Sequence, residues 1–591
     1  MKRKKNSIIL VLFILLAACF VMLAACKKCN HSVTYEQTVV EPDCESTGLI
    51  NIVCEKCAET VDTKTVEALD HKYDDWNITE NPTLYVDGKM QRVCERNPLH
   101  TETQSVPKLQ DGNSYTVAVT EQPTCSAKGK IKYTSSVYGT YECDIPADLH
   151  TYDESKEGYC KECGKQYYTV GLKYSLSDDG TYYIISNGQS NTLGTNIIIP
   201  HSYKNLPVKE IGYEAFVDKN ITSVTIPEYI EKIGSGAFNG SKLTKVNFNA
   251  INCDDFNQKN WVFLVGTKVE LTVGCRVEHI PARMFYPLVT QDRTVNLTKI
   301  TFEENSVCKS IGEYAFNKTN LTELTLPDSL ETIGDNAFYN TDISNLTVGS
   351  NVTVIGKFAF GACEKLVNVR FGKSLKQLCE DSFNYCTKLS AVDLSDTQVL
   401  SIDDDAFKGC SAVKNVKLPD TLTHIGKQAF YGCSSMSDLD LGTGLQYISE
   451  QAFAECNKLT AVTVPQNVTE IGNGAFSNCE SLSSIKFCAV RCKDLAGGNM
   501  VFANIGKENG VNVEFGSNVE HIPARLFYAS SNSAYIPALN KVTLGNKIES
   551  IGDYAFFGVS VTEAVYSGNL TEWQKITIGD GNSSLSYVIV K

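Results

Sequence analysis

The sequence is short of basic residues and of long apolar runs, and both shortages exclude classes of protein. Its 591 residues include 54 lysines and arginines against 68 aspartates and glutamates, which gives a formal net charge of -14. A nucleic-acid-binding face needs surplus positive charge, so this balance argues against a nucleic-acid partner. After residue 26 no apolar run reaches the roughly 18 residues of a membrane helix, so the body of the chain is expected to be soluble.

The sequence also lacks the motifs of several enzyme classes. It contains no glycine-rich phosphate loop and no His-Glu-x-x-His motif. The pairs Glu278-His279 and Glu520-His521 lie in distant parts of the chain, and no nucleophile, base and orienting acid stand out as a set. We therefore predict that the protein is not an enzyme and that it needs no cofactor for catalysis.

Residues 1–25 have the features of an export signal. A basic start at residues 2–5 precedes an almost uninterrupted apolar segment, residues 8–25. An uncleaved membrane anchor is the alternative, because the segment is just long enough to span a bilayer. The phrase Leu-Ala-Ala-Cys ends at Cys19 and again at Cys26, and it resembles the lipobox of bacterial lipoproteins, whose cysteine receives a diacylglyceryl group. We predict lipid attachment at Cys26, because polar sequence follows it directly.

Residues 26–170 contain loosely similar units marked by cysteine and histidine. The first unit includes Cys44, Cys54, Cys57 and His71, and later units keep some of these markers. Runs rich in threonine, valine and tyrosine between the markers predict short strands. The pattern resembles the small β modules that lie between anchor and binding domain in Firmicutes surface proteins, and we expect a stalk here.

The cysteines of this stalk have three open interpretations. Cys-x-x-Cys beside a histidine is metal-ligand spacing, so Cys143, His150, Cys160 and Cys163 could form one structural zinc site. Disulfides are the second interpretation, because they form readily outside the cell. The third is that these cysteines are remnants of a degenerate module and do neither.

One motif dominates the rest of the chain. Ile-Gly-x-x-Ala-Phe and close variants recur, and the phenylalanines of the central run are 22 to 24 residues apart. In the unit 459–479, an alternating segment predicts a half-buried strand and a tight turn carries Ala-Phe inward. Such a unit buries its apolar side only by stacking on its neighbours. The predicted fold is a mainly β solenoid with a short strand and a short helical or 3-10 turn in each coil.

The motif resembles the BspA-like leucine-rich repeat in its roughly 23-residue form, over residues 172–591. We expect an N-terminal cap at 171–210, repeats at 211–564 and a C-terminal cap at 565–591. Two inserts that match each other, at about 250–300 and 488–540, interrupt the period. Insertions in a solenoid leave the array as loops, so we expect loops there.

Small side chains share one position after the inward phenylalanine. The cysteines at this position are Cys363, Cys386, Cys410, Cys433, Cys456 and Cys479. Earlier coils place Ser241, Thr319 and Thr341 there. A position that accepts cysteine, serine or threonine favours a small filler, so we predict buried thiols.

The outward strand positions form the predicted binding face, which is polar and without aromatic residues. Its charged members in consecutive coils are Arg370, Asp393, Lys417, Asp438 and Asp440. Trp261 and Phe263, in the first insert, follow a polar run, and at least one of them is expected to reach solvent.

The family resemblance implies a monomeric, lipid-anchored protein on the extracellular face of a bacterial membrane. Its expected role is adhesion or interaction with an extracellular protein or glycan through the repeat surface. The alternative is a lipoprotein that captures a soluble glycan or peptide for a transporter. A wide, open face would favour a macromolecular partner, whereas a closed apolar pocket would favour capture.

Overall fold

The chain forms two compact units, residues 1–149 and 150–591. The computed structural model describes residues 33–590, except 43–46, 59, 83–87, 108, 110–113, 122–128, 146–155, 162–163, 189–192, 205, 259–260, 265, 288–294, 508 and 530–537. Residues 1–25 and Cys26 therefore lie outside the described part. No helix among the described residues combines the length and apolar character needed to cross a bilayer.

The second unit begins earlier than the stalk boundary predicted at residue 170. The backbone N–H of Thr169 donates to the carbonyl of Ile198 at 2.9 Å, and its Oγ1 accepts from the N–H of Ile198 at 2.8 Å. These bonds tie the end of the predicted stalk to the first coil of the array.

The first unit contains three antiparallel three-stranded sheets, in agreement with the predicted small β modules. In each sheet the second strand in sequence pairs with both others. Their strands are β1 (Thr34–Val40), β2 (Gly48–Cys54) and β3 (Thr60–Val66); β4 (Asn77–Glu80), β5 (Gly88–Cys94) and β6 (Asn97–Val106); and β7 (Thr116–Glu121), β8 (Gly129–Ser135) and β9 (Gly139–Ile145). The third module has its own small core of Leu109, Tyr115 and Tyr133.

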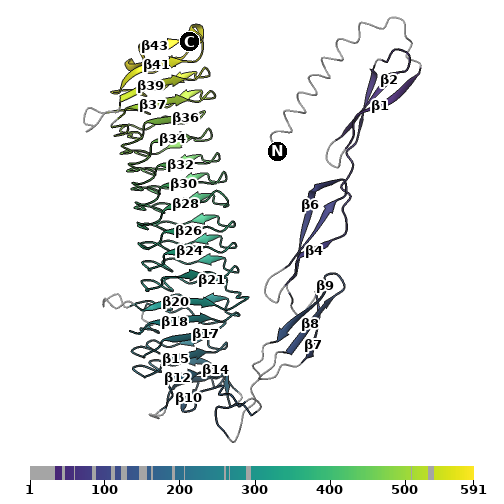
Figure 1. Ribbon diagram of the computed structural model, residues 1–591, viewed down its shortest axis with the longest axis vertical. Helices are drawn as coiled ribbons and strands as arrows, with labels where there is room; N and C mark the ends of the chain where they lie inside the picture. The colour runs from purple at the N-terminus through teal and green to yellow at the C-terminus, as the bar shows by residue number, and fades with distance from the viewer. Residues whose placement is uncertain are drawn as a thin grey trace. The chain divides into compact units, whose positions relative to one another are not determined.

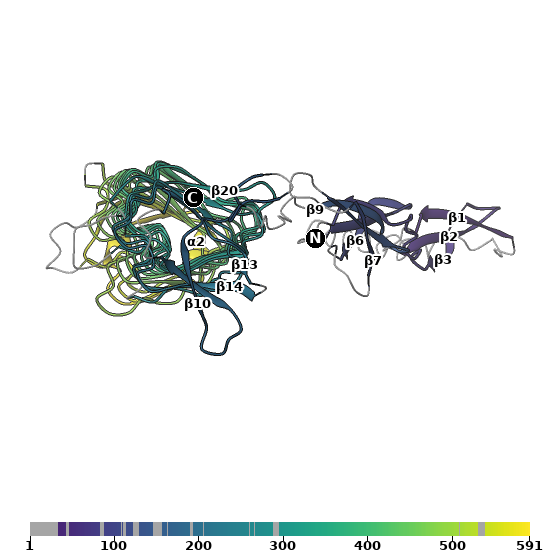
Figure 2. The same cartoon turned by 90° about the horizontal axis from the view of Figure 1, so that it is seen from below.

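The second unit is a solenoid of about 16 turns whose short strands stack in parallel ladders (Figure 1). An antiparallel pair, β10 (Leu172–Leu176) and β11 (Tyr183–Asn187), opens the array, and β13 (Ser202–Tyr203) pairs with β14 (Leu206–Ile211). Seen along the array, the coils lie over one another (Figure 2).

One ladder, here named the front ladder, carries the alternating segment of each repeat. Its strands are β12 (Asn196–Ile198), β15 (Ser223–Ile226), β17 (Lys245–Phe248), β18 (Val269–Val273), β20 (Leu297–Phe302), β22 (Leu324–Thr325), β24 (Asn345–Thr347), β26 (Asn368–Arg370), β28 (Ala391–Asp393), β30 (Asn415–Lys417), β32 (Asp438–Asp440), β34 (Ala461–Val464), β36 (Ser484–Phe487), β37 (Val511–Phe515), β39 (Ala538–Leu544), β41 (Ser560–Tyr566) and β43 (Val588–Val590). In β30, Val416 is buried between exposed Asn415 and Lys417, as the period of two requires.

A second ladder, here named the side ladder, carries the isoleucine of the motif. Its strands are β14 (Leu206–Ile211), β16 (Lys232–Ile233), β19 (His279–Ile280), β21 (Ser310–Ile311), β23 (Thr332–Ile333), β25 (Val354–Ile355), β27 (Gln377–Leu378), β29 (Ser401–Ile402), β31 (His424–Ile425), β33 (Tyr447–Ile448), β35 (Glu470–Ile471), β38 (His521–Ile522), β40 (Ser550–Ile551) and β42 (Thr577–Ile578). In each two-residue strand of the side ladder after β14 and before β42, the second residue is buried.

The inward phenylalanines form a continuous stack through the array, with ring centroids 4.9–6.1 Å apart. Its members are Phe216, Phe238, Phe263, Phe285, Phe316, Phe338, Phe360, Phe383, Phe407, Phe430, Phe453, Phe476, Phe502, Phe527 and Phe556. Phe263 and Phe502 belong to the two predicted inserts. Each insert therefore contributes a coil of its own.

The prediction that the inserts leave the array as loops is wrong where they form β18 and β37. In the first insert, β18 pairs in parallel with β17 and β20, and in the second, β37 pairs with β36 and β39. These coils use Val262-Phe263 and Val501-Phe502 in place of Ala-Phe, and all four side chains are buried.

The turn that carries Ala-Phe inward is hydrogen-bonded but is not a helix. The residue before Ala-Phe takes a positive φ, for example 56° at Tyr314 and 55° at Gln428, and a left-handed residue interrupts a right-handed helix. Among the described residues the helical elements are α2 (Leu570–Trp573) and the 3-10 turn η1 (Ser583–Leu585), both in the predicted C-terminal cap. Asn569 and Glu572 form a capping box at the start of α2.

Candidate functional site

The predicted charged strip lies on the front ladder with its side chains exposed. Arg370 ends β26, Asp393 ends β28, Lys417 ends β30 and Asp440 ends β32, and all are exposed. Parallel pairing places Lys417 between Asp393 and Asp440 in one register, and Asp438 beside Asn415. Asp393, Lys417 and Asp440 therefore form one column across adjacent coils, as the repeat period predicted, and Asp438 lies in the column beside it.

Two adjoining hollows cover this part of the front ladder, and we name them together the front groove. One hollow, of about 640 Å³, lies over β28, β30, β32 and β34, and the other, of about 700 Å³, lies over the ends of these strands and the turns that follow them. Leu439, Asp440 and Thr463 line both. Arg370 is outside the groove, whereas Asp393, Lys417, Asp438 and Asp440 line it.

Local hydrogen bonds orient the carboxylates of the front groove. Oδ1 of Asp393 accepts from the backbone N–H and the hydroxyl of Ser395, at 3.1 and 2.6 Å. Oδ1 of Asp440 accepts from the N–H of Gly442 at 3.1 Å. Oδ1 of Asp420, which the sequence did not single out, accepts from the N–H and hydroxyl of Thr443, both at 2.9 Å.

The apolar part of the groove comes from the turns after the strands. Leu418, Pro419, Leu441 and Pro465 line the second hollow, and each is mostly buried. Ala391 and Ala461 place small side chains at the neighbouring strand positions. The front groove thus has charged rims of aspartate and lysine above an apolar floor.

The two aromatic candidates of the first insert do not form a surface patch. Phe263 is 1% exposed and stacks between Phe238 and Phe285, so its prediction as a binding residue is wrong. Its ring completes the phenylalanine stack, which a sequence pattern fixed on Ala-Phe could not detect. Trp261 is partly buried and packs against the same core.

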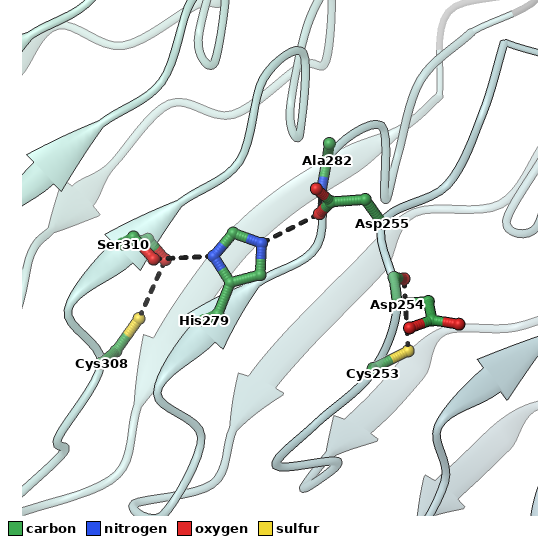
Figure 3. Close-up of polar contacts among 7 residues, drawn as sticks. All are labelled: Cys253, Asp254, Asp255, His279, Ala282, Cys308 and Ser310. Carbon is green, nitrogen blue, oxygen red and sulfur yellow. Dashed lines mark hydrogen bonds and ion pairs between the residues drawn. The ribbon is translucent and has the colours of Figure 1, made fainter.

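A serine, a histidine and an aspartate from three neighbouring coils meet at the side ladder (Figure 3). Nδ1 of His279 lies 2.7 Å from Oγ of Ser310, and Nε2 lies 2.9 Å from Oδ1 of Asp255. The same Oδ1 accepts from the backbone N–H of Ala282 at 2.7 Å. Burial raises the pKa of Asp255, but the Ala282 N–H and His279 outweigh it, so the pKa lies below its ordinary value.

The second repeat block contains the same arrangement. His521 lies 2.8 Å from Oγ of Ser550 through Nδ1 and 2.8 Å from Oδ1 of Asp494 through Nε2. Asp494 again accepts from a backbone N–H, that of Ala524, at 2.6 Å. The sequence predicts no set of nucleophile, base and orienting acid. The structure does bring a serine, a histidine and an aspartate within hydrogen-bonding distance, so that expectation is incorrect for the geometry.

The geometry favours a structural role for these sets. In coils without the histidine, Asp335 accepts from the N–H of Lys357 at 2.8 Å and Asp553 from that of Asp580 at 2.9 Å. The aspartate is thus a recurring cap of the next coil, to which His279 and His521 are added. Side chains of His279 and Asp255 are 36% and 60% exposed, whereas a charge relay gains strength from exclusion of water.

The predicted zinc ligands are only partly described. Cys143 lies in β9 and Cys160 is buried, with its N–H bonded to the carbonyl of Lys165, while His150 and Cys163 are outside the described residues. Within the described ranges, no three histidine, cysteine, aspartate or glutamate side chains are placed to hold a metal ion. The zinc site remains a prediction.

The second module contains a polarised cysteine that the sequence reasoning missed. Burial raises the pKa of Cys94, but hydrogen bonds from His71 and from the backbone N–H groups of Arg96, Asn97 and Lys72 lower it to about 6. His71 precedes Cys94 by the same number of residues as His31 precedes Cys54, and this spacing was the available signal.

Residues 186–292, 278–398, 380–505 and 496–582 match the model of the BspA type leucine-rich repeat region. The chain therefore belongs to the BspA-type leucine-rich repeat family. No curated protein matches it.

Several solved bacterial structures are similar to this chain. A leucine-rich repeat protein from Bacteroides ovatus is 22% identical, over 71% of this chain and 92% of its own, with a TM-score of 0.42. A leucine-rich cell surface protein from Faecalibacterium prausnitzii is 22% identical over 69% and 96%, with a TM-score of 0.29. The pneumococcal vaccine antigen PcpA is 18% identical over 71% and 97%, with a TM-score of 0.33.

Proposed function

We propose that this member of the BspA-type family is an exported bacterial surface protein that binds an extracellular macromolecule with its front ladder. The front groove is the observation that carries the proposal. Its lining residues Asp393, Lys417 and Asp440 are exposed and in register, so they face outward as one surface. Small-molecule sites enclose most of their ligand, and an open groove suits a larger partner better.

Display at the cell surface would follow from lipid attachment at Cys26. Two acyl chains bind a membrane stably where one is marginal. Wild-type protein expressed in a bacterial host should partition into the detergent phase, with an intact mass that corresponds to a diacylated N-terminus at Cys26. Cys26→Ser should be released or remain unprocessed. An unlipidated mature N-terminus elsewhere in the wild-type protein would refute the anchor and leave the binding proposal standing.

The binding proposal is tested with the full chain on a panel of purified matrix proteins, mucins and immobilised glycans. For any partner found, the variant Arg370→Glu/Asp438→Lys should bind with an altered association rate and salt dependence, because exposed charges steer encounter. The matched control is Lys541→Gln/Glu563→Gln, which removes an ion pair elsewhere on the front ladder.

Two outcomes would contradict this assignment. If charge reversal changes nothing while deletion of residues 27–149 abolishes binding, the site lies in the small β modules. If the panel reveals tight binding of free oligosaccharides or short peptides alone, the protein captures soluble ligands instead. Either result would remove the front groove from its proposed role.

A further inference from the structure

Four carboxylates of the front groove form no ion pair with any residue that the structure describes. Among the residues that the structure describes, no ion pair joins Asp393, Asp420, Asp438 or Asp440 to lysine, arginine or histidine. Farther along the same ladder, acidic residues are neutralised by adjacent coils: Lys486 pairs with Glu514 at 3.1 Å and Lys541 with Glu563 at 3.2 Å. The groove is thus an anionic surface, whereas Glu514 and Glu563 farther along the same ladder have their charges neutralised.

The carboxylates are also oriented in advance. Asp393, Asp420 and Asp440 each use Oδ1 for bonds to nearby N–H or hydroxyl groups, and none of the hydrogen bonds among the described residues uses their Oδ2. The side-chain bond from Ser395 lowers the pKa of Asp393, so this carboxylate stays ionised in mild acid. A ligand that binds Oδ2 therefore contacts side chains that are already ordered, so binding costs less conformational entropy.

Resting on the proposed function, we propose that the partner presents an extended polypeptide segment rich in arginine and lysine to the front groove. The charge favours a cation, and arginine pairs well with carboxylates. The long aliphatic stems of these side chains suit the floor formed by Leu418, Leu441 and Pro465. The groove lining contains no aromatic residue on which a sugar ring would stack, and its charge would repel an acidic glycan.

Lys417 makes this proposal sharply testable, because it is the one cation among the lining residues. It lies in register between Asp393 and Asp440, and no ion pair to either is formed. A cationic segment must pass its ammonium group. Removal of this charge should therefore strengthen binding, which a merely structural role of Lys417 would not do.

The experiment measures fluorescence anisotropy of a labelled peptide of alternating arginine and glycine against the full chain. A matched glutamate-glycine peptide, a neutral chitin oligosaccharide and heparin are the comparison probes. We expect saturable binding of the arginine peptide that weakens at higher salt, and weaker or no binding of the others. Asp420→Asn/Asp440→Asn should raise the Kd about tenfold, as expected for two exposed ion pairs that together contribute about 1.4 kcal/mol, and Lys417→Gln should lower it.

Control variants separate local from general charge effects. Lys486→Gln/Glu514→Gln leaves net charge unchanged and lies outside the groove, so it should leave the Kd unchanged. Equal binding of the arginine and glutamate peptides, or a Kd unaffected by both groove variants, would overturn the proposal. If the arginine peptide fails while a matrix protein or mucin still responds to reversal of Arg370 and Asp438, the proposed binding function stands and only the cationic partner is wrong.

Discussion

The rings of Phe430 and Phe453 stack with centroids 5.2 Å apart and planes 3° from parallel. Phe430 also stacks on Phe407 at 5.2 Å, and none of its surface is exposed. Its backbone N–H donates to the carbonyl of Ala452 in the next coil at 2.8 Å. One residue therefore joins three coils through both side chain and backbone.

Phe430→Ala should lower the free energy of unfolding by about 3–5 kcal/mol, because it leaves a cavity between two fixed rings. Phe216→Ala, near the start of the array, should cost less, since the stack among the described residues continues from Phe216 only through Phe238. Urea unfolding followed by circular dichroism measures both. Equal, small losses of unfolding free energy at the two positions would contradict a core stabilised by stacking between neighbouring coils.

Gly409 and Gly432 occupy equivalent left-handed turns, with φ of 72° and 71°. A Cβ at Gly409 would lie 2.6 Å from the ring of Tyr385, whereas at Gly432 the nearest atoms are 3.9 Å away. Gly432→Ala should cost about 1 kcal/mol from backbone strain alone, and Gly409→Ala more. Tyr385→Ala should remove the difference in urea unfolding. If the two alanine variants are equally stable, the clash is relieved without cost.

The cysteine column is protected by burial. Cys433 donates to the carbonyl of Phe407 in the preceding coil at 3.4 Å, whereas Thr341, at the same repeat position, donates to the carbonyl of Phe338 in its own coil at 3.0 Å. Burial raises the pKa of Cys433 and Cys386 well above the ordinary thiol value. In native protein these thiols should resist iodoacetamide at mildly alkaline pH, while half-buried Cys488 should react sooner.

The same burial makes stability depend on alkaline pH. Above the ordinary thiol pKa of about 8.5 the unfolded chain loses protons that the native cysteines retain, so the free energy of unfolding should fall as pH rises. Replacement of Cys386 and Cys433 by serine should reduce this slope, because the hydroxyl does not titrate there and can donate to the phenylalanine carbonyl of its own coil, as Ser241 donates to Phe238 at 2.7 Å. Peptide mapping of alkylated protein and urea melts at several pH values provide the measurements. Rapid native alkylation of Cys433 would show that the coils open locally.

Periodicity was sufficient to predict the solenoid, the outward column from Asp393 to Asp440 and the buried cysteine positions. These features repeat, and each depends on residues within one coil. The coils that carry Phe263 and Phe502 were not predicted, because valine replaces the alanine of the motif there. The position of the phenylalanine ring is nevertheless kept. The spacing of rings was therefore a better guide than the motif letters.

The groove and the histidine sets were harder to predict for a different reason. Asp420 joins the groove through a hydrogen bond from Thr443, one coil away, and Asp255, His279 and Ser310 come from three coils. Such contacts depend on the orientation of side chains in neighbouring coils, which cannot be predicted from the sequence of a single repeat. Comparison of the two repeat blocks would have aligned Asp255 with Asp494 and Ser310 with Ser550.

The histidine sets predict a pH-dependent contribution to stability. The pKa of Asp255 is below its ordinary value of about 3.9, so the stabilisation is complete above that value and is lost as pH falls through the lowered pKa. Asp255→Asn should cost about 1 kcal/mol at neutral pH, the usual net worth of a hydrogen bond. At a pH low enough to protonate Asp255, the variant and the wild type should be equally stable.

Asp335→Asn is the matched control for this effect, because Asp335 caps Lys357 without a histidine. The excess cost of Asp255→Asn over Asp335→Asn then measures what His279 adds, and His279→Ala should remove that excess in a double-mutant cycle. Asp494→Asn in the second block should reproduce it and add to the first, since the two sets share no residue. Urea melts of the single and double variants at neutral and acidic pH give these values. If Asp255→Asn and Asp335→Asn cost the same while His279→Ala is neutral, the histidine contributes nothing and the aspartate acts as a cap alone.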